Sequence, residues 1–128
     1  MIEFVGEIGD TDKSAFLGNA RALLFPIDWP EPFGLVMAES LACGTPVIAR
    51  RRGSVPEVVE DGVTGWIGET DEDLAHACGN LEVLNRAACR AIAEQRFSSA
   101  VMTEGYVQAY HRLINAESRQ IVTTAVAT

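Results

Sequence analysis

Apolar residues along this chain fall into short continuous runs that alternate with stretches of helical spacing. The runs predict four buried strands, over residues 2–6, 22–26, 46–50 and 65–68. The stretches between them predict helices over residues 11–21 and 33–41 and a short helix near Val55, and Asp10 is a candidate cap for the first. Strands separated by helices indicate an α/β protein, with a Rossmann-like parallel sheet flanked by helices on both faces.

After Gly68 the pattern becomes helical to about residue 118. Thr70 and Asp73 resemble a capping box that opens a helix to about residue 80, a second helix is expected near 85–95, and Ser98 is expected to cap a third. Six residues of the third helix recur at helical spacing and predict a stripe for core or interdomain packing: Val101, Met102, Tyr106, Ala109, Tyr110 and Leu113. We therefore expect one domain over residues 1–117 and a flexible tail over 118–128.

Composition narrows the functional classes. The chain has 128 residues and a net charge of −8, which argues against nonspecific nucleic-acid binding. The basic cluster Arg50–Arg52 is expected to be a solvated turn rather than a phosphate clamp. The sequence contains neither a bilayer-length apolar run nor a leader pattern. Cys43, Cys78 and Cys89 lack metal-type spacing and indicate structural thiols in a reducing compartment, so we expect a cytoplasmic protein without a metal.

Two glutamates eight positions apart, Glu31 and Glu39, give the strongest chemical signal. With Pro32 in a helix first turn, Glu31 is expected at the helix N-terminus and Glu39 about two turns along, roughly 10–12 Å away. Free N–H groups at that end suit a diphosphate, and carboxylates suit hydroxyls, so a nucleotide-sugar fits the spacing. Taken singly, each glutamate is more simply explained as a solvated charge.

The sequence motifs on both sides of Glu31 and Glu39 resemble those of a known family. These motifs are Leu23–Pro26, Glu31–Val36 with Glu39, Ala42–Ala49, Gly53–Val59 and Asp61–Trp66. In this order the segment from Ala22 to Gly68 resembles the donor-binding half of the family 4 (group 1) retaining glycosyltransferases of the GT-B fold. Looser likeness continues on both sides. The resemblance implies transfer of a hexose from a UDP- or GDP-sugar to an acceptor, with retention of configuration and no metal or other cofactor.

The resemblance also assigns roles to residues. Glu31 would accept hydrogen bonds from the transferred sugar, as the candidate catalytic residue, and is better read as a positioning group than as a nucleophile. Glu39 would bind the ribose hydroxyls. Ile8 and Asp10 would lie against the base, although Asp10 is equally a helix cap and Ile8 equally a packing residue. Backbone N–H groups would hold the sugar and diphosphate, and they come from Phe33, Gly34, Leu35 and Val36.

Parts of the family pattern are not found in the sequence. The C-terminal half of resembling enzymes has about six strands in the order 3-2-1-4-5-6, and the first two are unmatched here. The Arg and Lys that resembling enzymes place against the donor phosphates, and the whole acceptor domain, are also unmatched. We therefore expect a fragment, inactive in isolation, with exposed strand edges that favour self-association.

Two other readings remain open at this point. The first is a noncatalytic nucleotide-sugar-binding remnant. The second is a dinucleotide-binding oxidoreductase, which the sequence disfavours because no Gly-x-Gly-x-x-Gly turn follows a strand. His76 and His111 are expected to be surface or packing residues.

Overall fold

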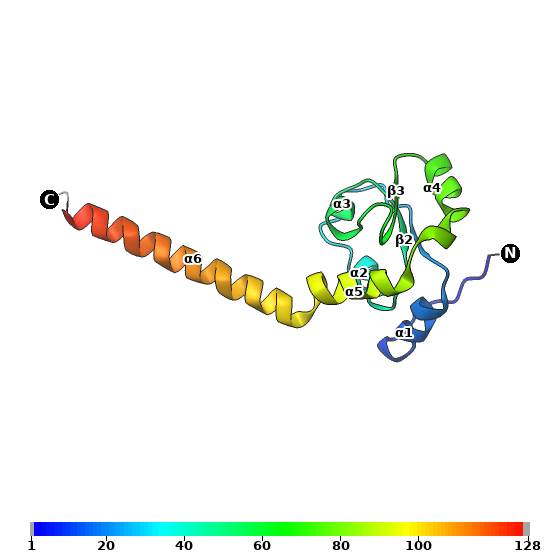
Figure 1. Cartoon of the computed structure of the whole chain (residues 1–128), viewed down its shortest axis with the longest axis horizontal. Coiled ribbons are helices and arrows are strands. Elements are labelled where there is room, and N and C mark those ends of the chain that lie inside the picture. The colour runs from blue at the N-terminus through cyan, green and yellow to red at the C-terminus, as the bar shows by residue number, and fades with distance from the viewer. Residues whose placement is uncertain (1, 127–128) are drawn as a thin grey trace. The chain divides into compact units, whose positions relative to one another are not determined.

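The computed structural model describes residues 2–126, with side chains described through residue 116. It comprises two compact units that divide after Glu94. The elements of the first unit are α1 (Asp10–Asn19), β1 (Leu23–Phe25), α2 (Leu35–Ala42), β2 (Val47–Arg50), α3 (Val55–Val58), β3 (Gly65–Gly68), α4 (Asp71–Cys78), the 3-10 helix η1 (Leu81–Val83) and most of α5 (Arg86–Phe97) (Figure 1). The second unit contains α6 (Ser99–Val126).

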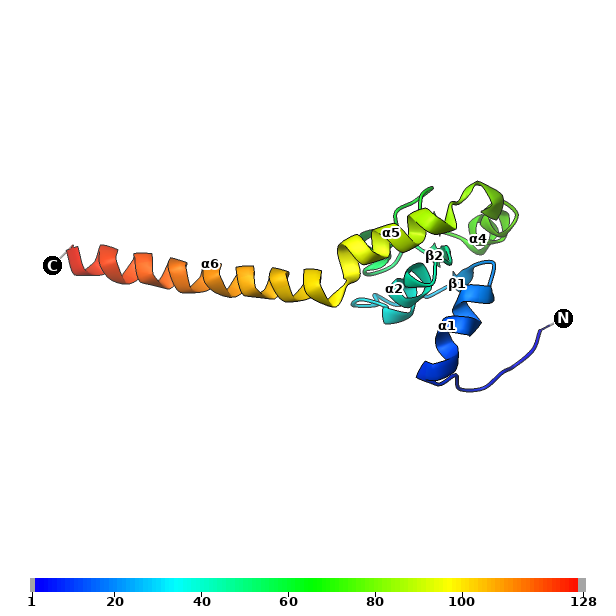
Figure 2. The same ribbon diagram turned by 60° about the horizontal axis from the view of Figure 1, so that its bottom comes forward.

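The sheet has three parallel strands in the order β1-β2-β3, so the α/β prediction is confirmed. Ile48 of β2 stands between Leu24 and Trp66 in register, and the three residues Val47–Ala49 are at most 1% exposed. Ile48 packs with Leu74 of α4 on one face. Helix α2 contacts β1 and β2 and lies on the opposite side from α4 (Figures 1 and 2). Side chains of the central strand β2 therefore alternate between two buried faces of the sheet, one under α4 and one under α2.

The strand predicted over residues 2–6 is wrong. These residues run as an extended segment before α1 (Figure 2), with Phe4 96% and Val5 53% exposed. A strand needs a neighbour to satisfy its backbone groups, and no strand in residues 2–126 lies beside this segment. The apolar run is therefore present without the partner that would make it a strand.

The two edges of the sheet differ. On the outer side of β3, Ile67 N donates to Asp61 Oδ1 (2.9 Å) and Gly65 O accepts from Gly62 N (2.8 Å), so a turn covers this edge. Strand β1 pairs only with β2 among the described strands, and Leu24 is 52% exposed. An uncovered edge is a template for pairing with another chain. Self-association through β1 stays a prediction.

The start of α4 confirms the predicted capping box. Thr70 Oγ1 accepts from Asp73 N (3.1 Å), and Asp73 Oδ2 accepts from Thr70 N (2.9 Å) and Glu69 N (3.0 Å). These backbone bonds to the carboxylate, that from Thr70 first, lower the pKa of Asp73. Two N–H groups that the helix leaves unpaired are thereby satisfied.

Within the second unit, Ser98 Oγ accepts from Val101 N (3.4 Å), as its predicted capping role requires. Five residues of the predicted stripe are exposed, from 43% at Val101 to 66% at Leu113, and Ala109 is partly buried, so the prediction of this stripe as core is wrong for the described residues. A single helix has no facing surface within its unit, and packing against another domain stays a prediction. Helix α6 runs to Val126 through most of the predicted tail. Residues 127–128, and the side chains after residue 116, lie outside the described residues.

No helix in the described part of the chain combines the length and the apolar character needed to cross a bilayer.

Candidate functional site

The N-terminus of α2 differs from its prediction. Gly34 is the N-cap, in the left-handed conformation with φ 72°, and the helix begins at Leu35. Pro32 therefore lies in the preceding loop rather than in the first turn. A residue at positive φ cannot continue a right-handed helix, which is why the predicted start at residue 33 is wrong. Only Glu39 lies on α2, so the spacing predicted from helical rise does not apply.

Glu31 nevertheless lies at the mouth of α2. Its Oε1 accepts a hydrogen bond from Gly34 N (3.2 Å), and its Oε2 accepts one from Trp29 Nε1 (3.1 Å). Both carboxylate oxygens are oriented by neutral donors, and each keeps lone pairs for further hydrogen bonds. Leu35 N and Val36 N have no partner among the described residues, so these two N–H groups remain available to an anion, whereas Gly34 N, also predicted to hold the donor, donates to Glu31.

A second glycine determines where the Glu31 backbone lies. Ser54 N donates to Glu31 O (2.9 Å), and Gly53 stands directly against the Glu31 peptide with φ 49°. A Cβ at Gly53 would overlap the amide nitrogen and carbonyl oxygen of Glu31. Sequence reasoning included Gly53 in the family resemblance without a role. The sequence does show a glycine just after a strand, which indicates a tight turn. It does not show that this glycine contacts Glu31, because Glu31 is 22 positions away.

Glu39 is held by an ion pair. Its Oε1 lies 2.8 Å from Lys13 Nζ of α1, which also lies 3.1 Å from Asp10 Oδ1. These contacts, that with Glu39 first, raise the pKa of Lys13. Asp10 is the first residue of α1, and its prediction as a cap is wrong because Gly9 is the N-cap and forms no side-chain cap. The structure thus brings Asp10 and Glu39 to one cation, while Ile8 is half-buried just before α1.

Two buried hydrogen bonds and one exposed one fix α2 and the turn after it against their neighbours. Ser40 Oγ donates to Thr45 O (2.9 Å), and Thr45 Oγ1 donates to Leu17 O of α1 (2.7 Å). Arg90 donates to Ala42 O at the end of α2 (2.5 Å). With Met37 fully buried, the helix that carries Glu39 is anchored along its length.

The arginine cluster supports loops. Arg50 pairs with Asp28 (3.1 Å) and with Asp71, and Arg51 pairs with Glu69 (2.9 Å). Hydrogen bonding to Asp71, the largest cause, raises the pKa of Arg50. These charges already have carboxylate partners, which argues against a phosphate clamp. The predicted solvated turn describes Arg51 and Arg52 but not Arg50, which ends β2 and whose side chain is 16% exposed.

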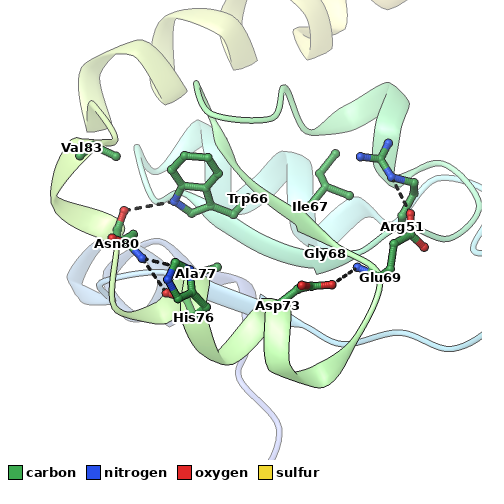
Figure 3. Close-up of a pocket in the computed structure, with 10 residues that line it drawn as sticks. All are labelled: Arg51, Trp66, Ile67, Gly68, Glu69, Asp73, His76, Ala77, Asn80 and Val83. Carbon is green, nitrogen blue, oxygen red and sulfur yellow. Dashed lines mark hydrogen bonds and ion pairs between the residues drawn. The ribbon is translucent and has the colours of Figure 1, made fainter.

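A separate hollow lies beside β3 and α4 and shares no residue with the predicted site (Figure 3). Its polar groups bond to one another or to backbone. Trp66 Nε1 donates to Asn80 O (3.1 Å), Asn80 Nδ2 donates to His76 O (2.9 Å), and Asp73 caps α4. His76 and His111 are exposed, consistent with surface residues. These internal bonds explain the polar lining without a ligand.

Among side chains that the structure describes, no group of three or more His, Cys, Asp or Glu could hold a metal ion. Transfer without a metal stays a prediction. Burial raises the pKa of the Cys89 thiol, and burial in α5 fits the structural role predicted for this cysteine.

Comparison with known proteins places this geometry in a family. Residues 1–96 match the glycosyl transferases group 1. A D-inositol 3-phosphate glycosyltransferase of Mycobacterium tuberculosis is 33% identical over 93% of this chain and 27% of its own length. An uncharacterized 41.2 kDa protein in the cps region of Klebsiella pneumoniae is 31% identical over 85% of this chain and 32% of its own.

Solved structures agree. Anabaena Alr3699/HepE in complex with UDP and glucose has a TM-score of 0.71 at 25% identity, over 86% of this chain and 32% of that chain. Its complex with UDP-glucose has a TM-score of 0.66 at 26% identity, over 79% and 30%. This chain thus spans about a third of the length of the proteins it matches. By sequence and by fold, it belongs to the group 1 glycosyl transferases.

Proposed function

We propose that this chain forms the donor-binding part of a glycosyltransferase that transfers a hexose from a UDP- or GDP-sugar to an acceptor, with retention of configuration. The observation that carries the proposal is the Glu31 carboxylate, held at the start of α2 beside the unpartnered Leu35 N and Val36 N. A carboxylate for hydroxyls and N–H groups for an anion are the two chemistries that a sugar diphosphate requires.

The proposed chemistry depends on charge. Departure of a nucleoside diphosphate puts negative charge on the leaving phosphate, and the N-terminus of α2 stabilises that charge with N–H groups already in place. Glu31 accepts hydrogen bonds from the sugar hydroxyls and positions the reacting carbon. Its negative charge also favours the positive, oxocarbenium-like transition state.

Glu39 is proposed to bind the ribose. One of its oxygens is taken by Lys13, and the other keeps its capacity to accept from a hydroxyl. Asp10 and Ile8 are proposed to lie near the base, since Asp10 contacts the same lysine. Uridine is the first base to test, because Alr3699/HepE is known in complex with UDP and with UDP-glucose.

The test is calorimetric titration of the chain with UDP and UDP-glucose. Glu39→Gln should lower UDP affinity about tenfold, or about 1.4 kcal/mol. Glu31→Gln should leave UDP affinity unchanged and lower UDP-glucose affinity, because Glu31 contacts the sugar. Unchanged UDP affinity in Glu39→Gln would remove the ribose assignment, and no UDP binding by the unmodified chain would overturn the proposal.

The alternative is a binding remnant without turnover. The uncovered β1 edge, and a length about a third of that of the matched proteins, favour a chain that needs further structure for transfer. We propose that the 128 residues alone bind the donor without transferring its sugar. Sugar transfer by this chain alone would exclude the remnant.

A further inference from the structure

The Lys13–Glu39 pair connects α1 to the proposed ribose carboxylate. Lys13 is the only lysine among 128 residues, and its Nζ lies 2.8 Å from Glu39 Oε1. The side chains of Lys13 and Glu39 are 34% and 37% exposed, so both are partly sheltered from water. The pair therefore sits where an ion pair orients its members more firmly than on an open surface.

We infer that Lys13 is a positioning residue of the donor site, acting through Glu39. By taking Oε1 it selects one orientation of the carboxylate and leaves Oε2 for the ribose hydroxyls. Its charge also offsets that of Glu39, which would otherwise repel an approaching diphosphate. Asp10 is the other charged group that contacts Lys13, and it holds the ammonium from its own helix.

A purely structural role, docking α1 on α2, is the competing explanation. Other bonds already hold α1 at its opposite end. Thr45 Oγ1 donates to Leu17 O (2.7 Å), and Arg86 donates to Gly18 O and Ala20 O (each 2.7 Å). An ion pair whose side chains are 34% and 37% exposed still contributes little to stability. The Lys13–Glu39 pair is thus dispensable for packing α1, which leaves the orientation of Glu39 as its role.

This inference rests on the proposed function, and one experiment tests both. Calorimetry with UDP compares the unmodified chain with Lys13→Met, Lys13→Gln and Glu39→Gln. Arg21→Met is the matched control, because it removes one positive charge and one exposed ion pair, Arg21–Glu82 (3.2 Å). We expect both Lys13 variants to lose about tenfold in UDP affinity while Arg21→Met loses none. Melting temperatures of Lys13→Met and Arg21→Met should agree within a few degrees.

The double variant Lys13→Met/Glu39→Gln separates positioning from direct contact. If Lys13 acts through Glu39, the double variant should bind UDP as Glu39→Gln does. A further loss would mean that Lys13 acts directly on the ligand and would overturn the positioning role. Equal UDP affinity in Lys13→Met and Arg21→Met, alongside a loss in Glu39→Gln, would overturn the inference alone. Absence of UDP binding by the unmodified chain would overturn the proposed function and the inference together.

Discussion

The two glutamates of the site are held in opposite ways. Glu31 lies in a loop and accepts from neutral N–H donors, Gly34 N and Trp29 Nε1, and forms no ion pair among the described side chains. Glu39 lies on α2 against the ammonium of Lys13, so its charge is offset. In the proposed function, Glu31, which has no ion-pair partner among the described side chains, lies beside the sugar carbon that becomes positive. Glu39, whose charge is offset by Lys13, lies nearer the diphosphate. The contrast suggests that local donors assign different tasks to identical side chains.

The largest loss of stability should come from disturbing the packing of Gly53 against the Glu31 backbone, a contact that Glu39 does not have. Gly53→Ala combines positive φ with overlap of the Glu31 backbone, and we expect a loss of about 3 kcal/mol in unfolding free energy. UDP-glucose should lose its affinity advantage over UDP, while binding through Glu39 persists. Thermal melts and calorimetry give both readouts.

Gly62→Ala is the control for this variant. Gly62 has φ 77°, and an added Cβ would meet only ordinary contacts, at 3.7 Å from Trp66. It should lose about 1–2 kcal/mol from backbone strain alone, without a change in donor binding. If Gly53→Ala and Gly62→Ala lost the same unfolding free energy and bound UDP-glucose equally, the packing of Gly53 against Glu31 would have no role in donor binding.

A smaller effect is expected at Gly34, where the left-handed N-cap aims the amide at Glu31. Gly34→Ala should cost about 1–2 kcal/mol, because φ is 72° and its Cβ would lie 2.6 Å from Met37 Cε. Donor affinity should fall at least tenfold, or about 1.4 kcal/mol, since the Cβ narrows the approach to the N–H groups.

The matched control is Gly18→Ala, in the last turn of α1, where a Cβ meets nothing within 4 Å. Alanine there should raise the melting temperature, because it is the better helix former. A similar rise in Gly34→Ala would contradict the left-handed cap. If Gly34 lay inside the helix, as the sequence pattern predicts, Gly34→Ala would raise the melting temperature. The left-handed cap seen in the structure predicts a lower melting temperature instead.

The smallest effect should follow removal of one donor to Glu31. Trp29→Phe deletes the indole N–H to Oε2, and Trp29 is 60% exposed, so stability should change little. UDP-glucose affinity should fall about threefold while UDP affinity is unchanged. Trp66→Phe removes an equivalent bond to Asn80 O and should leave both affinities as they are. A loss of UDP affinity in Trp29→Phe would show that the two ends are coupled.

The sequence was most reliable where local physics decides. Buried-strand runs predicted β1, β2 and β3 because an apolar run between turns needs no distant information. The box of Thr70 and Asp73 was confirmed because its bonds span three residues. The helix start at residue 33 failed because the left-handed φ of Gly34 is one of several conformations that a glycine allows.

Within the site, the sequence by itself selected Glu31 and Glu39, because the motifs around them resemble those of a known family and the pair was not assigned on its spacing alone. Only the tertiary structure decided what surrounds them. Lys13 is 26 positions from Glu39 and Gly53 is 22 from Glu31, so their contacts depend on how α1 and the loop after β2 pack. The run at 2–6 stayed unpaired for the same reason. Chain-distant residues supply the counter-charge of Glu39 and the packing against the Glu31 backbone, and no local pattern encodes them, whereas the donors to Glu31 are two and three positions away.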